Sequence, residues 1–173
     1  MPIVEFPTLM RAAERGGYAV GYFESWSLES LLAVADAAER TRSPVILGFS
    51  GIHLTAPERR VADPLGAYAA MGREIGRGLI VPACLLFNES PNFEAVVAAI
   101  APEFGLVMCS DDAPAATVLE ERVGRVVALA HGAGVLVEGE TMPLAGVGGG
   151  LASAPDDRRL TDPQVARAFV EQT

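Results

Sequence analysis

Residues 83–90 read ACLLFNES, and this stretch decides how the rest of the chain can fold. Its first five residues are apolar without alternation, which is typical of a strand that is buried on both faces of a parallel sheet. The run then ends abruptly in an amide, Asn88, and a carboxylate, Glu89. The sequence therefore predicts a buried strand whose polar end either simply reaches water or forms the edge of an active site.

Further apolar runs along the chain have the same texture. They are YAVGYF (18–23), PVILGF (44–49), LIVPACLLF (79–87, which contains the first stretch), GLVMC (105–109) and GVLVEGE (134–140). Apolar residues at helical spacing predict helices between these runs and at both ends, at about 7–15, 27–40, 64–77, 92–100, 115–131 and 162–172. The pattern is a regular alternation of strands and helices.

Five strands that alternate with helices predict an α/β fold with parallel strands and right-handed crossovers. Two architectures fit this order. One is a doubly wound open sheet of five strands, and the other is the first five βα units of a (β/α)8 TIM barrel, which normally needs about 250 residues. In both architectures ligands bind at the carboxyl ends of the strands.

The composition indicates one globular domain over residues 1–173, with 50% hydrophobic and 20% charged residues. The longest apolar run, residues 78–87, is too short to span a bilayer, and no secretory signal precedes it. Two cysteines, Cys84 and Cys109, fall in strand-like runs and are typical of buried thiols in a reducing compartment. We therefore expect a cytoplasmic protein.

The charge of the chain excludes two classes of partner and one class of chemistry. The net charge is −9 and no run of basic residues occurs, so nothing attracts nucleic acid or an anionic membrane. All 13 basic residues other than histidine are arginines. A mechanism that forms a Schiff base on lysine is therefore impossible on this chain.

Polar residues collect where the predicted strands end. They are Glu24, Ser50, His53, Asn88, Glu89, Ser110, Glu138 and Glu140. Glu138 and Glu140 are two residues apart on the predicted fifth strand, so their carboxylates point to the same side. Paired carboxylates can bind a metal ion or act as an acid–base pair, and we expect a functional rim here. His53 alone is a poor signal for a metal site.

The chain resembles the class II, metal-dependent fructose- and tagatose-bisphosphate aldolases. The resemblance covers nearly all residues and rests on segments in the family's order and spacing. These segments are GGYAVGYF (16–23), AAERTRSPVILGFS (37–50), GLVMCSDDAP (105–114), ALAHGAGVLVEGE (128–140) and LTDPQVARAFVEQT (160–173). The resemblance implies a (β/α)8 barrel, of which this chain holds five units and stops before strand six.

Residue by residue, the resemblance implies both agreements and departures. Glu140 matches a metal-site glutamate and Ser50 matches a serine that contacts substrate, with Glu138 in support. Asn88 stands where the family has its catalytic aspartate, and Glu89 stands where it has the first zinc-binding histidine.

Two more departures follow from the same comparison. Ser110 replaces an aspartate near the metal, and Glu24 replaces an asparagine that touches substrate. The resemblance places two further zinc-binding histidines and the main phosphate-binding loops beyond the fifth unit.

Two functions fit these residues. The first is a lyase of the class II aldolase type that uses a divalent metal to cleave a ketose phosphate or a related keto compound. The resemblance implies zinc as the metal, whereas an oxygen ligand such as Glu89 would also suit magnesium or manganese. The second is a catalytically silent relative, without metal, that binds a sugar phosphate or serves as an assembly subunit, because an asparagine cannot transfer a proton.

The open edges of five parallel strands predict a partner. Apolar side chains and unpaired backbone groups of the first and fifth strands would otherwise be exposed. We therefore expect a homo-oligomer or a complementary polypeptide that completes the barrel, and not a stable monomer.

Overall fold

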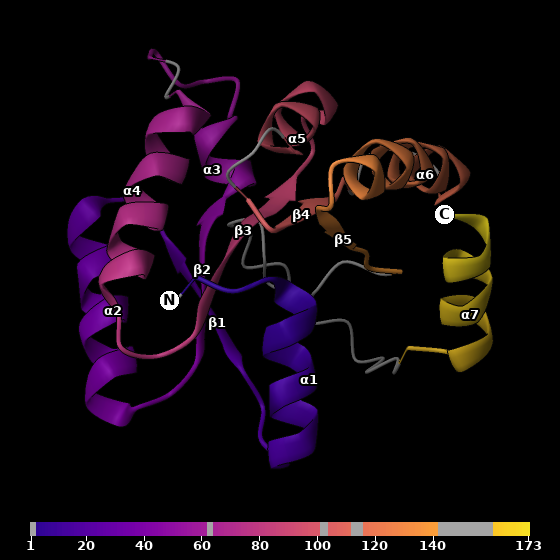
Figure 1. Cartoon of the computed structure of the whole chain (residues 1–173). Coiled ribbons are helices and arrows are strands. Elements are labelled where there is room, and N and C mark those ends of the chain that lie inside the picture. Colours follow the sequence, from indigo (N-terminus) through magenta and orange to yellow (C-terminus); the bar gives the residue numbers. More distant parts are fainter. Residues whose placement is uncertain (1–2, 62–63, 101–103, 112–115, 142–160) are drawn as a thin grey trace, which may run out of the picture.

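The computed structural model describes residues 3–61, 64–100, 104–111, 116–141 and 161–173. These residues form one parallel five-stranded sheet in the order β1-β2-β3-β4-β5, flanked by helices (Figure 1). The strands are β1 (Gly21–Ser25), β2 (Val45–Ser50), β3 (Ala83–Ser90), β4 (Leu106–Cys109) and β5 (Leu136–Glu138). The helices are α1 (Phe6–Gly16), α2 (Leu28–Thr41), α3 (Gly51–Leu54), α4 (Leu65–Gly78), α5 (Phe93–Ile100), α6 (Ala116–Gly132) and α7 (Pro163–Gln172).

The strand order decides between the two predicted architectures. Each strand pairs with its neighbours in the sequence, β1 with β2 through to β4 with β5, and the order never reverses. A doubly wound open sheet has such a reversal at its ligand-binding point. The open-sheet alternative is therefore wrong, and the prediction of a partial TIM barrel is confirmed.

Three local predictions differ from the structure. β3 begins at Ala83 and not at residue 79, because Leu79 to Pro82 form the turn that leaves α4. Glu140 was predicted on the fifth strand, which is wrong, since β5 ends at Glu138. The single turn α3 was not predicted, because four residues are too few for a helical apolar pattern.

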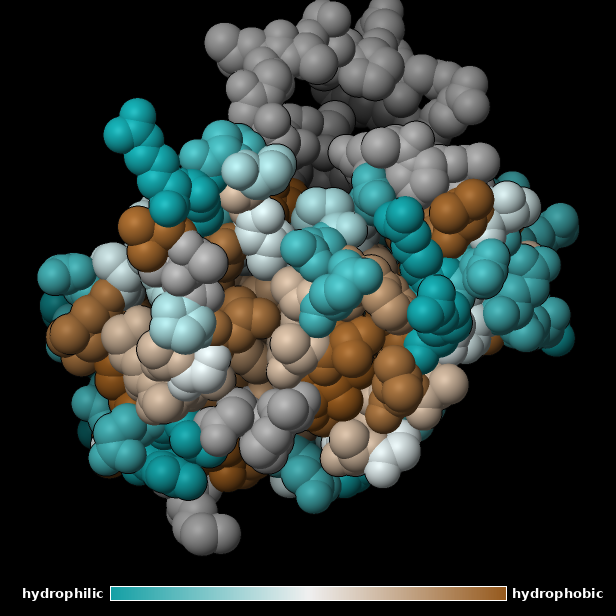
Figure 2. Space-filling view, turned by 90° about the horizontal axis from the view of Figure 1, so that it is seen from above, coloured by the Kyte–Doolittle hydropathy of each residue, from teal (hydrophilic) through white to brown (hydrophobic). Residues whose placement is uncertain are grey.

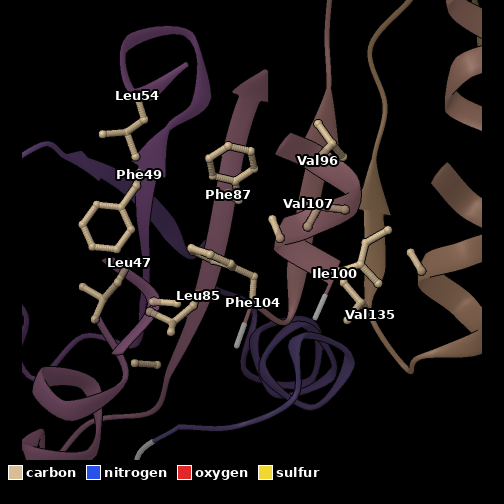
Figure 3. Close-up of a cluster of buried hydrophobic side chains, with 14 of the residues drawn as sticks. Leu47, Phe49, Leu54, Leu85, Phe87, Val96, Ile100, Phe104, Val107 and Val135 are labelled. Carbon is tan, nitrogen blue, oxygen red and sulfur yellow. The ribbon is translucent and has the colours of Figure 1, made fainter. Parts of the chain in front are cut away.

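The sheet separates two apolar layers. On the outer face, Leu47 and Phe49 of β2 and Phe87 of β3 pack under α2, α4, α5 and α6 (Figure 3). On the inner face, Ile46 and Leu86 alternate with them in sequence and pack against α1. Both faces of the central strands are thus buried, which explains why their sequences do not alternate between apolar and polar residues.

Helix α1 covers only part of the inner face. Its Leu9 is 1% exposed and belongs to the inner layer with Leu86 and Met108. Figure 1 shows α1 beside the lower half of the sheet, away from α3, which follows the carboxyl end of β2. The carboxyl-end half of the inner face is therefore left for polar side chains.

The surface on the side where the strands end is chemically mixed. Figure 2 views the molecule from above, and hydrophobic residues there lie between hydrophilic ones. No helix among the described residues combines the length and the apolar character needed to cross a membrane.

Candidate active site

Strand periodicity places the polar residues on the inner face. In β3, Ala83, Leu85 and Phe87 face the outer layer, so Asn88 faces inward with Cys84 and Leu86. The same alternation directs Glu24 inward from β1, together with Tyr22. It also directs Glu138 inward from β5, together with Leu136.

The Glu24 carboxylate is the centre of a hydrogen-bonded group. The Tyr22 hydroxyl donates to Glu24 Oε2 at 3.1 Å, and the Asn88 amide Nδ2 donates to the same oxygen at 3.5 Å. His53 Nδ1 lies 4.0 Å from Glu24 Oε1. Burial, and then the negative charge of Glu24, raise the pKa of Tyr22, so its hydroxyl keeps its proton and remains a donor.

Ser50 and His53 are held together by the turn that follows β2. Ser50 is the last residue of β2 and caps α3, and its Oγ lies 2.7 Å from His53 Nδ1. Ser50 is 1% exposed, whereas the side chain of His53 is 65% exposed. The turn thus connects a buried hydroxyl beside Asn88 of β3 to an imidazole in contact with water.

The end of β3 has an unusual backbone. Its pairing with β4 shifts register between Phe87 and Ser90, as in a β-bulge, and Glu89 has a φ of 43°. A non-glycine residue in this left-handed region costs free energy and is found preferentially at functional sites. The bulge changes the direction of the side chain, so that Glu89 lines the same cavity as Asn88.

Three carboxylates approach one another across the rim. Burial raises the pKa of Glu89, and the negative charges of Glu140 and Glu24 raise it further, while a hydrogen bond from Asn88 lowers it. Burial and then Glu140 likewise raise the pKa of Glu138. The Ser110 hydroxyl donates a hydrogen bond to Glu140 Oε1. We call Glu89, Glu138 and Glu140 the acidic cluster.

The acidic cluster faces a cavity of about 480 Å³ between the sheet and α7. The sheet and the segment that follows β5 contribute Tyr22, Asn88, Met108, the acidic cluster, Gly139 and Thr141 to its lining, and α7 with the residue before it contributes Thr161, Ala166, Phe169 and Val170. Its volume suits a small ligand.

The predicted metal ligands only partly form a site. In the part of the chain that the structure describes, no group of three His, Cys, Asp or Glu side chains is arranged to hold a metal ion. Mutual repulsion within the acidic cluster would nevertheless be relieved by a cation. Glu89, Glu140 and the Ser110 hydroxyl thus fit as a partial set of oxygen ligands, and the set is incomplete.

Every predicted rim residue is connected to this site. Glu24 and Ser50 contact His53, Glu24 contacts Asn88, and Ser110 contacts Glu140. Sequence reasoning missed Tyr22 and the lining residues of α7. Tyr22 could have been found, because it lies two residues before Glu24 and so shares its face.

Comparisons with known proteins agree on one family. The model of the family described as fructose-bisphosphate aldolase class-II matches residues 4–173. The fructose-bisphosphate aldolase of Thermus caldophilus is 32% identical over 165 residues, which are 95% of this chain and 52% of that protein. The probable fructose-bisphosphate aldolase of Bacillus subtilis is 32% identical over 179 residues, covering all of this chain and 59% of that protein. The chain spans about half the length of these relatives.

Solved structures share the fold. The YdjI aldolase from Escherichia coli K12 has a TM-score of 0.74 at 22% identity, covering 99% of this chain and 58% of that one. The fructose-bisphosphate aldolase from Campylobacter jejuni has a TM-score of 0.64 at 17% identity, covering 78% of this chain and 46% of that one.

Proposed function

Since this chain belongs to the class-II fructose-bisphosphate aldolase family, we propose that it takes part in the reversible, metal-dependent aldol cleavage of a ketose phosphate or a related keto compound. The observation that carries this proposal is the cavity between the sheet and α7. The acidic cluster, suited to a cation, lines this cavity together with Asn88, whose amide donates a hydrogen bond to Glu24 behind it.

The residues divide into two proposed roles. Glu140 and Glu89 would bind the divalent metal, with Ser110 orienting Glu140 and Glu138 in support. Ser50 and Glu24 would bind substrate hydroxyls beside Asn88. When bound, a divalent metal polarises the ketone carbonyl and stabilises the negative charge that develops as the carbon–carbon bond breaks.

The identity of the metal follows from the donor atoms. Zinc is the expectation from the family resemblance, but Glu89, Glu140 and Ser110 offer oxygen atoms only. Oxygen ligands favour magnesium and manganese more than histidine would.

Metal content tests this proposal. Protein incubated with zinc, manganese or magnesium and then exchanged into metal-free buffer should retain one divalent ion per chain, measured by elemental analysis. Glu140→Ala should lose it, because one carboxylate ligand is removed. Glu121→Ala, an exposed glutamate on α6, should keep it. A parent protein without metal would reject the proposed metal site.

A catalytically silent relative is the second candidate, and Asn88 favours it. Its amide stands on the inner face at the end of β3 and has no titratable proton at neutral pH. Such a protein would bind a sugar phosphate without cleaving it. Binding of fructose 1,6-bisphosphate, measured by calorimetry, without release of triose phosphates would support it over the aldolase.

We also propose the setting in which the chain works. Residues 1–173 would form one domain of five βα units, and further polypeptide from the same or another chain would pair with β1 and β5, the outer strands of the described sheet. The buried free thiols of Cys84 and Cys109 suit the cytoplasm.

A further inference from the structure

The carboxylates of the rim form two groups with different surroundings. Within the acidic cluster, the neighbours that affect Glu89 and Glu138 most after burial are other carboxylates. Glu24, on β1, is instead contacted by polar groups that can donate hydrogen bonds or carry a positive charge. The first group suits a cation, and the second holds one carboxylate in a fixed orientation by hydrogen bonds.

Three features prepare Glu24 for proton transfer. The Tyr22 hydroxyl and the Asn88 amide both hold Oε2, at 3.1 and 3.5 Å, which fixes the orientation of the carboxylate. Its Oε1 has no such short contact with these two residues and faces His53 Nδ1 at 4.0 Å. The side chain of Glu24 remains 24% exposed, so a ligand can reach it.

Asn88 lies beside this carboxylate but cannot do the same work. An amide donates and accepts hydrogen bonds and does not exchange a proton at neutral pH. We propose that Glu24 is the carboxylate that transfers the proton in aldol cleavage by this protein, with Asn88 orienting it. This inference rests on the proposed aldolase function.

The step balances as follows. The Glu24 carboxylate takes the proton from the hydroxyl group on the carbon that becomes the aldehyde. The electron pair of that O–H bond becomes the second bond of the aldehyde C=O, the adjacent carbon–carbon bond breaks, and its electron pair moves into the ketone fragment as an enediolate. In the condensation direction, Glu24 returns its proton to the aldehyde oxygen.

His53 lies beside Glu24 on the turn that follows β2. Its Nδ1 lies 2.7 Å from Ser50 Oγ and 4.0 Å from Glu24 Oε1, and 65% of its side chain is exposed. His53 is therefore assigned a positioning role beside Glu24, and Glu24 is the group assigned to the substrate hydroxyl.

Two readouts separate this step from the rest of the reaction. Cleavage of fructose 1,6-bisphosphate, followed as triose phosphate release with manganese present, requires proton transfer at the aldehyde oxygen. Exchange of the carbon-bound hydrogens of dihydroxyacetone phosphate with D₂O, followed by NMR, requires only enediolate formation. Glu24→Gln should lower cleavage by about 10²- to 10⁴-fold and leave the exchange within about threefold of the parent.

Exchanging the two side chains provides a second test. Glu24→Asn should lose cleavage. The double variant Glu24→Asn/Asn88→Asp should cleave at least about tenfold faster than Glu24→Asn, because it places a carboxylate at the position of the Asn88 amide. Asn88→Ala, which removes the amide without moving the acid, should retain more cleavage than Glu24→Gln.

The outcomes distinguish this inference from the proposed function. A parent protein that is inactive in the cleavage assay and in the exchange assay would reject the proposed aldolase function and, with it, the assignment of Glu24. An active parent with unimpaired cleavage in Glu24→Gln, or with cleavage and exchange lowered equally, would reject only the assignment of Glu24.

Discussion

At the scale of single residues, the absence of a Cβ atom at Gly48 makes room for a side chain of the site. A Cβ atom added at Gly48 of β2 would lie 2.6 Å from the Leu86 carbonyl oxygen and would overlap the Tyr22 ring. The Tyr22 ring occupies this space, and its hydroxyl donates a hydrogen bond to Glu24 Oε2. A glycine at position 48 is therefore needed for the close approach of the Tyr22 ring to β2. The Tyr22 hydroxyl in turn orients the Glu24 carboxylate.

Gly48→Ala should therefore destabilise the fold by about 1–3 kcal/mol, because a strand carbonyl cannot move aside as a flexible side chain can. Unfolding in urea, followed by circular dichroism, measures this change. Gly66→Ala, near the start of α4 where the added methyl group meets no atom within 4 Å, is the matched control and should not lower the stability, because alanine favours a helix more than glycine does. Equal stability of the two variants would contradict the close approach.

At the scale of elements, α7 supports the acidic cluster. Phe169 is 9% exposed and its ring lies against Gly139, where an added Cβ would come within 2.6 Å of it. Gly139 separates Glu138 from Glu140 in the sequence. The docking of α7 therefore holds in place the short segment that carries two of the three clustered carboxylates.

Phe169→Ala should release α7 from the sheet, since loss of a buried phenylalanine ring costs about 3–5 kcal/mol where the site cannot collapse. Hydrogen exchange should show faster exchange in residues 163–172, and the affinity for divalent metal should fall. Val165→Ala, on the same helix, 51% exposed and outside the cavity lining, should leave both unchanged. Full protection of α7 in Phe169→Ala would show that other contacts hold it.

At the scale of the whole molecule, a net charge of −9 adds to the repulsion within the acidic cluster. Burial and Glu140 raise the pKa of Glu138 above its ordinary value of 4.5, so the folded state binds this proton more tightly than the unfolded state. The stability that the protonated form contributes is present below pH 4.5 and is lost as the pH rises through the folded-state pKa.

Metal-free Glu138→Gln should therefore unfold at a higher temperature than the metal-free parent at pH 7, and the difference should shrink as the pH falls below 4.5. Calorimetry across this pH range measures it. Glu121→Gln, which removes the same charge from an exposed site on α6, should show no such dependence. A parent more stable than Glu138→Gln at pH 7 without metal would contradict the raised pKa.

The sequence by itself determined the alternation of strands and helices and the polar residues at the strand ends. Unbroken apolar runs such as ACLLF predict buried strands without reference to the rest of the chain. A strand that is buried on both faces has apolar residues at every position, whereas a half-exposed strand alternates apolar and polar residues. The family resemblance, carried by segments spread over the chain, was also visible in the sequence and agrees with the family match over residues 4–173.

Only the tertiary structure decided the strand order, the end of β5 and the contacts of Glu24. Strand pairing joins residues far apart in the chain, such as Ser50 and Asn88, and local patterns do not encode it. The hydrogen bond between Asn88 and Glu24 joins two strands across 64 positions of the sequence. A site of this kind is defined by packing between strands, because the chemistry requires distances that no single segment can set.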